Sequence, residues 1–201
     1  MIAVITGDII NSRKHDTSLW ITSLKEMLNN FGDSPKDWEI FRGDSFQLKI
    51  KVSQALKAAI LIKSCIKQHK DIDVRQAIGI GDEIYASDKI TEANGSAFSN
   101  SGDCFEQLKK STLAIKSPSD EFDKTINIML DLALLTMNHW TPTSAKFIML
   151  SLQHPESNQN QLAAMTRTTQ GNLSRGLKRG GYDEISKLLD YYNIQTSKLW
   201  P

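Results

Sequence analysis

The 201-residue sequence predicts an α+β fold with a mixed N-terminal part and an all-helical C-terminal part. Up to about residue 116, segments with strand patterns alternate with segments whose apolar residues recur at helical spacing. Lys116-Ser117-Pro118-Ser119 is the clearest linker in the chain, and every later segment has helical periodicity. We therefore expect two domains, formed by residues 1–118 and residues 119–201.

The N-terminal part has the predicted order β-α-β-β-α-β-α-β. Short apolar or alternating runs predict its strands at residues 2–7, 38–50 (a hairpin), 74–81 and 112–115. Apolar residues at helical spacing predict its helices at residues 16–31, 53–69 and within 92–110. Within the hairpin, Arg42-Gly43-Asp44 interrupts the alternation with residues that suit a tight turn.

This order predicts a ferredoxin-like palm, which is an antiparallel-rich sheet with helices on one side. Right-handed crossover connections place the first strand in the middle of the sheet, beside the hairpin. The end of the first strand and the tip of the hairpin then lie at the same edge. We therefore expect Asp8 and Asp44, which follow glycines at these two places, to lie close together.

Two converging carboxylates predict a divalent metal site for Mg²⁺ or Mn²⁺, because Mg²⁺ takes oxygen ligands. Asp8 and Asp44 would supply the carboxylates and Ile9 a backbone carbonyl. Two metal ions about 4 Å apart would suit phosphoryl chemistry. The residues expected to contact a nucleotide or phosphate are Asn11, Ser12, Arg13, Arg42 and Gly43. Lys14 and Arg75 are further cations that could face phosphate. The alternatives are that Asn11 or Ser12 caps a turn, and that each of these cations is solvated or paired with a nearby acid.

The C-terminal part predicts five helices, at residues 120–139, 141–152, 159–165, 169–179 and 182–192. The third and fourth of them form a candidate helix-turn-helix. The residues expected to face inward are Leu162, Ala163, Leu173 and Leu177. Gly171 and Gly176 lower the helix propensity of the second helix by roughly 1 kcal/mol each relative to Ala.

The outer face of residues 169–179 has the side chains that a DNA recognition helix uses to bind base edges and phosphates. They are Thr169, Gln170, Asn172, Arg175, Lys178 and Arg179. Between residues 158 and 181 there are four basic residues and no acid. The pattern predicts binding to double-stranded DNA. The alternatives are a solvated helical bundle and a module used for protein contacts or dimerization.

Bulk composition restricts the partners that the whole molecule can attract. The formal net charge is +1, so any surface for a polyanion must be local. No apolar run approaches the roughly 20 residues of a membrane helix, and the first residues enter a strand at once. Cys65 and Cys104 are isolated in apolar helical patterns. We expect a reduced cytoplasmic protein without a membrane segment.

Two resemblances support these expectations. The segment Val4–Lys14, together with Gly43-Asp44-Ser45-Phe46-Gln47, resembles the SatD family, a poorly characterised bacterial group with a small tail similar to DNA-binding modules. The element order, the segment Val74–Gly81 and Gly95-Ser96-Ala97-Phe98 resemble the catalytic palm of class III nucleotide cyclases. The second resemblance implies that Asp8 and Asp44 are metal ligands.

The chain departs from the cyclase pattern at two positions. Ser99 and Asp103 stand where those cyclases have an asparagine and an arginine, and an acid there would repel a triphosphate. We therefore expect a bacterial transcriptional regulator, whose palm binds a metal or nucleotide and whose helix-turn-helix binds DNA as part of a homodimer. The alternatives are a metal-dependent nucleotidyl transferase or cyclase, and an inactive palm used for dimerization.

Overall fold

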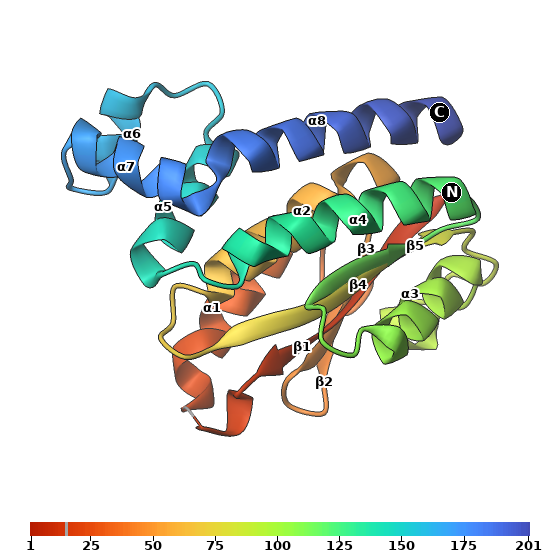
Figure 1. Cartoon of the computed structure of the whole chain (residues 1–201). Coiled ribbons are helices and arrows are strands. Elements are labelled where there is room, and N and C mark those ends of the chain that lie inside the picture. The colour runs from red at the N-terminus through yellow and green to blue at the C-terminus, as the bar shows by residue number, and fades with distance from the viewer. Residues whose placement is uncertain (15) are drawn as a thin grey trace.

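The computed structural model describes residues 1–14 and 16–201 and has an α+β fold (Figure 1). A five-stranded mixed sheet lies between helices, and a group of helices from the C-terminal part extends beyond one end of the sheet. The predicted chain order β-α-β-β-α-β-α-β is present from β1 to β5. Among the described residues, no helix combines the length and the apolarity that a membrane span requires.

The sheet has β1 at its centre. The strands are β1 (Ile2–Ile10), β2 (Trp38–Phe41), β3 (Ser45–Ile50), β4 (Asp73–Gly81) and β5 (Leu113–Lys116). Their order is β2-β3-β1-β4-β5. β1 runs antiparallel to both β3 and β4, and only β5 pairs in parallel, with β4. β1 is longer than predicted, so that Asp8 lies within the strand instead of after it.

Helices cover both faces of the sheet (Figure 1). The helices of the N-terminal part are α1 (Thr17–Asn29), α2 (Val52–Ile66) and α3 (Ser96–Gln107), with short 3₁₀ helices at Ser12–Lys14 and Ile90–Glu92. α1 and α2 bury the main core against Ile5, Leu48 and Ile78. α3 packs on the opposite face, where Cys104 and Leu108 contact Ala77.

The position of α3 corrects the prediction of helices on one side of the sheet. Two glycines of β4 explain how the helix packs there. A Cβ atom at Gly79 would lie 2.2 Å from the backbone nitrogen of Ser101, and one at Gly81 would lie 2.5 Å from that of Ala97. Because neither glycine has a side chain, the backbone of α3 can lie directly on the strand.

The helices of the C-terminal part are α4 (Asp120–Met137), α5 (Pro142–Gln153), α6 (Gln159–Met165), α7 (Gln170–Gly180) and α8 (Tyr182–Leu199). α8 is longer than the predicted 182–192 and extends beside α2 and α4 (Figure 1). Its Tyr192 hydroxyl donates to the carbonyl of Val52 at 2.8 Å. One continuous apolar core therefore includes the sheet, α1, α2 and the helices after the linker.

α4 protects the β5 edge of the sheet. The side-chain amide of Asn127 accepts a hydrogen bond from the Ile115 backbone N–H at 2.8 Å and donates to the Ile115 carbonyl at 2.9 Å. One side chain thus pairs with the backbone of β5 as a neighbouring strand would. Exposed strand edges are templates for aggregation, and covering them with a helix is a known protection.

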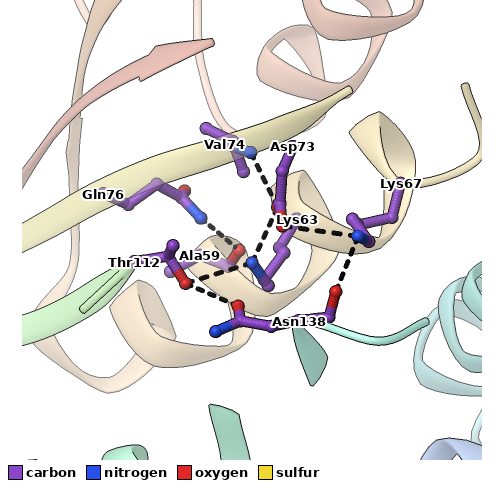
Figure 2. Close-up of polar contacts among 8 residues, drawn as sticks. All are labelled: Ala59, Lys63, Lys67, Asp73, Val74, Gln76, Thr112 and Asn138. Carbon is purple, nitrogen blue, oxygen red and sulfur yellow. Dashed lines mark hydrogen bonds and ion pairs between the residues drawn. The ribbon is translucent and has the colours of Figure 1, made fainter. Parts of the chain in front are cut away.

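A buried ion pair joins α2 to β4 (Figure 2). The Lys63 ammonium is fully buried, and it donates to Asp73 at 2.7 Å and to the Thr112 hydroxyl at 3.2 Å. Thr112 in turn donates to the side chain of Asn138, the residue that follows α4, at 2.7 Å. Desolvation lowers the pKa of Lys63, while Asp73 opposes that shift. This network fixes the end of α4, which is followed in the chain by α5.

Candidate functional site

Asp8 faces the α3 side of the sheet and is paired with Arg75. The two residues are directly opposite in the β1–β4 register. Arg75 Nη2 donates to Asp8 Oδ2 at 2.7 Å and Nε donates to Oδ1 at 3.2 Å. The guanidinium also lies 4.6 Å from the ring centroid of Phe105 in α3. The charge of the first predicted metal ligand is therefore compensated by a cation of the protein.

Asp44 lies in the turn immediately before β3, and its backbone fixes the hairpin to the end of β1. The Ile9 N–H donates to the Asp44 carbonyl at 3.0 Å, while the Ile9 side chain is buried in the core. The Ser12 hydroxyl, which is also buried, donates to Asp44 Oδ2 at 2.6 Å. The predicted meeting of the β1 end and the hairpin tip is therefore present.

The other predicted phosphate ligands have different surroundings. Asn11 has a positive φ of 65°, and its side-chain amide donates to the Asp71 carbonyl at 3.0 Å. Arg42 and Gly43 form the exposed hairpin tip with φ angles of 53° and 91°. Arg13 is exposed in the 3₁₀ helix that follows β1. Two cations thus flank the hairpin and the end of β1, while Asn11 has a role in the backbone turn.

As arranged, this donor set does not fit a two-metal centre. The Asp8 carboxylate already has both oxygens bound by Arg75, and Asp44 accepts a hydrogen bond from Ser12. Over the described part of the chain, no group of three or more His, Cys, Asp or Glu residues could hold a metal ion. We therefore derive no reaction step from these two acids.

A cavity of about 1060 Å³ lies at the opposite end of the sheet, lined by Ile2, Ile50 and Glu83 among others.

The second candidate site is the α6–α7 unit, two helices joined by residues 166–169 (Figure 1). Asn158 and Gln161 form a capping box at the start of α6. The Thr169 hydroxyl accepts from the Asn172 N–H at 3.3 Å and caps α7. All four residues expected to face inward are buried: Leu162, Ala163, Leu173 and Leu177. The local sequence therefore specifies both helix starts and the contact between the helices.

All six residues predicted to bind DNA are exposed on the outer side of this unit: Thr169, Gln170, Asn172, Arg175, Lys178 and Arg179. Two of them have side-chain partners within α7, since Arg175 Nη2 donates to Asn172 Oδ1 at 2.6 Å. Gln170 donates to Gln159 of α6 at 2.6 Å. Arg167, in the turn, is exposed as well. The unit thus presents four basic side chains to solvent on a stretch without acids.

Two glycines of α7 have a packing role that sequence reasoning missed. A Cβ atom at Gly176 would lie 2.4 Å from the ring of Phe147, and one at Gly180 would lie 3.0 Å from Ile148. The Trp140 indole N–H donates to the Gly180 carbonyl at 2.8 Å. α7 can therefore lie close to α5, with its basic face turned outward. The sequence contains a signal for this close packing, because Gly176 and Gly180 are four residues apart and so lie on one face of the helix.

Sequence reasoning also missed two ionic contacts. Arg75 was a candidate cation for phosphate or a partner for a nearby acid, but that acid was not identified as Asp8, although a correct strand register places the two opposite each other. Sequence reasoning left Lys63 within the apolar run 58–66 unexplained. A lone lysine in such a run is a signal of a buried, paired charge, because lysines are almost never buried without a partner.

Comparison with protein-family models finds no match to this chain, and comparison with curated proteins finds no significant match.

Proposed function

We propose that this protein is a DNA-binding regulatory protein whose α6–α7 unit is a helix-turn-helix. One observation carries the proposal. The outer face of α7 presents all six predicted DNA-binding residues to solvent, in a stretch whose charged residues are all basic, on a chain of net charge +1. A local basic surface on an otherwise neutral protein is the electrostatic feature expected of a nucleic-acid site.

In this proposal α7 is the recognition helix and enters the major groove. Its N-terminal residues Gln170 and Asn172 would contact base edges, since amide side chains bind adenine with two hydrogen bonds. Lys178 and Arg179, near the C-terminal end, would bind phosphates and orient the helix. Arg175 lies between them and can serve either purpose. The packing of Gly176 against Phe147 supports this orientation, because it directs the opposite face of α7 outward.

We further propose that the N-terminal part is a ferredoxin-like palm in a cytoplasmic bacterial regulator, as the resemblance to the SatD family implies. The antiparallel order β2-β3-β1-β4 supports the palm, because it places β1 between the hairpin and β4. Its regulatory ligand would be a metal ion or a nucleotide near Asp44, Arg13 and Arg42. Binding of a metal ion by Asp8 would require Arg75 to release it.

Fluorescence anisotropy with a labelled duplex of random sequence, at a salt concentration of about 50 mM, tests the DNA-binding proposal. We expect saturable binding that the double variant Arg175→Ala/Lys178→Ala weakens at least about tenfold. The matched control removes two exposed lysines of the N-terminal part, Lys25→Ala/Lys110→Ala, and should bind almost as well as the wild-type protein. Equal binding by wild type and both variants would refute the assignment of α7.

A second candidate function is a metal-dependent nucleotidyl transferase or cyclase. The hydrogen bond from the Ile9 N–H to the Asp44 carbonyl favours it, because it holds the end of β1 beside the hairpin tip. This function would also require Arg75 to release Asp8. Release of pyrophosphate from a nucleoside triphosphate with Mg²⁺ or Mn²⁺, abolished by Asp44→Asn, would support this function. If the protein neither releases pyrophosphate nor binds metal or nucleotide in calorimetry, a palm used for dimerization remains.

A further inference from the structure

α4 carries a second apolar stripe that no other described element covers. One side of α4 buries Phe122, Ile126, Leu130 and Leu134 in the core. On the outward side, Ile128, Leu132 and Leu135 are 54%, 64% and 72% exposed. Single exposed aliphatic residues are normal, but three that are contiguous on one helix face indicate a contact surface. We call these three residues the α4 stripe.

The α4 stripe is the centre of a longer heptad pattern. The outward positions Glu121, Thr125, Ile128, Leu132, Leu135 and His139 follow one another at alternating intervals of four and three residues. This spacing is the a/d repeat of helices that pack against another helix. The backbone N–H of His139 donates to the Thr136 carbonyl at 3.0 Å, so the helical turn continues to this last position. The pattern therefore has apolar residues in the middle and polar residues at both ends.

We propose that the α4 stripe binds the α4 stripe of a second copy of this chain, with the two helices antiparallel. In one antiparallel register, Ile128 lies opposite Leu132 of the second copy, and each Thr125 lies opposite a Leu135. The same register places Glu121 of each copy opposite His139 of the other. Apolar residues thus meet in the centre, and an acid meets an imidazole at both ends of the contact.

The charges of α4 favour the antiparallel arrangement over the parallel one. The first turn of α4 contains Asp120, Glu121 and Asp123, and its last turn has no basic residue. A parallel pair would bring the acidic first turns of the two copies together, and like charges in contact repel. An antiparallel pair separates these turns by the length of the helix. For 18 residues that length is about 27 Å.

The size of the contact predicts a weak and reversible dimer. A helix face about 27 Å long buries less than the roughly 800 Å² per partner of a standard interface. We therefore expect a dissociation constant in the micromolar range, on the order of 10 µM. This inference is independent of the proposed DNA binding, since it uses no residue of α6 or α7.

Sedimentation velocity over a concentration series tests the association. We expect the wild-type protein to change from 22.6 kDa monomer to dimer as its concentration rises. Leu132→Glu places a carboxylate at the centre of the stripe and should weaken dimerization by roughly 100-fold. The matched control is Ile84→Glu, at a loop residue that is 83% exposed, and it should dimerize like the wild type. A monomer at all concentrations, or a dimer unaffected by Leu132→Glu, would overturn the proposal.

Cross-linking tests the antiparallel register. The variants Glu121→Cys and His139→Cys, mixed and treated with an oxidant, should form a disulfide-linked heterodimer faster than either variant links to itself. The native Cys65 and Cys104 are buried and should contribute little background. Preferential linkage of Glu121→Cys to itself would indicate a parallel pair and would contradict the proposed arrangement. Absence of any linkage in a sample that sediments as a dimer would contradict it too.

Discussion

The guanidinium of Arg75 binds both carboxylate oxygens of Asp8, with N–O distances of 2.7 and 3.2 Å across the β1–β4 pair. This contact decides how the first candidate site can be used. A two-point contact between arginine and carboxylate is among the stronger polar contacts in proteins, and lysine does not reproduce it. A metal ion would therefore compete with Arg75 for Asp8, whereas Asp44 accepts its hydrogen bond from the neutral side chain of Ser12.

Removing the charge of Arg75 should increase the affinity for a divalent cation. In Arg75→Gln, the Asp8 carboxylate loses its cationic partner, and we expect Mn²⁺ to bind at least about tenfold more tightly than to the wild type. Isothermal titration calorimetry measures the change. The double variant Arg75→Gln/Asp8→Asn is the control and should lose the gain. Equal Mn²⁺ affinities in wild type and Arg75→Gln would show that Arg75 does not limit access to Asp8.

The buried Lys63–Asp73 pair should respond asymmetrically to substitution. Asp73→Asn leaves the fully buried ammonium without its carboxylate, and we expect a loss of about 3 kcal/mol in the free energy of unfolding. Lys63→Met should cost about 1 kcal/mol or less, because Asp73 keeps Lys67 at 3.4 Å and the Val74 N–H at 2.8 Å (Figure 2). Urea denaturation of both variants measures these values. Equal losses would contradict the account of this network.

Gly171 and Gly176 form a matched pair within one helix. Substituting either glycine with alanine favours the helix by up to about 1 kcal/mol, because alanine has the higher helix propensity. At Gly171 a Cβ atom meets open space, so we expect stabilisation. At Gly176 it would lie 2.4 Å from the buried Phe147 ring, so we expect destabilisation by about 1–3 kcal/mol. Thermal unfolding distinguishes the two, and a stable Gly176→Ala variant would show that α5 and α7 are less tightly packed.

Alkaline pH should weaken folding through the two thiols. Burial raises the pKa of Cys65 from 9.0 to about 12 and that of Cys104 to about 11. Between about pH 9 and pH 11 the unfolded thiols therefore lose protons that the folded thiols keep, and stability falls as pH rises. The decline approaches roughly 2.7 kcal/mol per pH unit for both thiols together.

Urea denaturation at several pH values measures this decline. The Cys65→Ala/Cys104→Ala variant is the control, because it lacks both thiols and should lose much less stability over the same range. If both proteins had the same dependence on pH, the thiols would not be the cause. A thiol reagent near pH 8 gives a second check, since the native protein should react far more slowly than the urea-unfolded one.

Local patterns predicted the order of the elements well. The chain order from β1 to β5 and the central place of β1 followed from periodicity and the handedness of crossovers. The predicted helices 16–31 and 169–179 begin at the observed N-caps Asp16 and Thr169, because a cap depends on the residue itself and its near neighbours.

Properties that depend on contacts between distant segments were predicted less well. α3 lies on the second face of the sheet because Gly79 and Gly81 permit it, and periodicity alone contains no information on which face a helix covers. The pairing of Asp8 with Arg75, which are 67 residues apart in the chain, depends on the register of β1 and β4. Gly176 lowers helix propensity, and its packing against Phe147 becomes evident only when α5 and α7 are placed together.

The salt dependence of DNA binding tests the central claim most directly. If the four basic residues of the α6–α7 unit each neutralise one phosphate, the logarithm of the binding constant should fall against the logarithm of the salt concentration with a slope of about −3.6. The Arg175→Ala/Lys178→Ala variant should reduce the size of this slope by about 2. No binding to duplex DNA at low salt, or an unchanged slope in the variant, would contradict the assignment of α7 as a recognition helix.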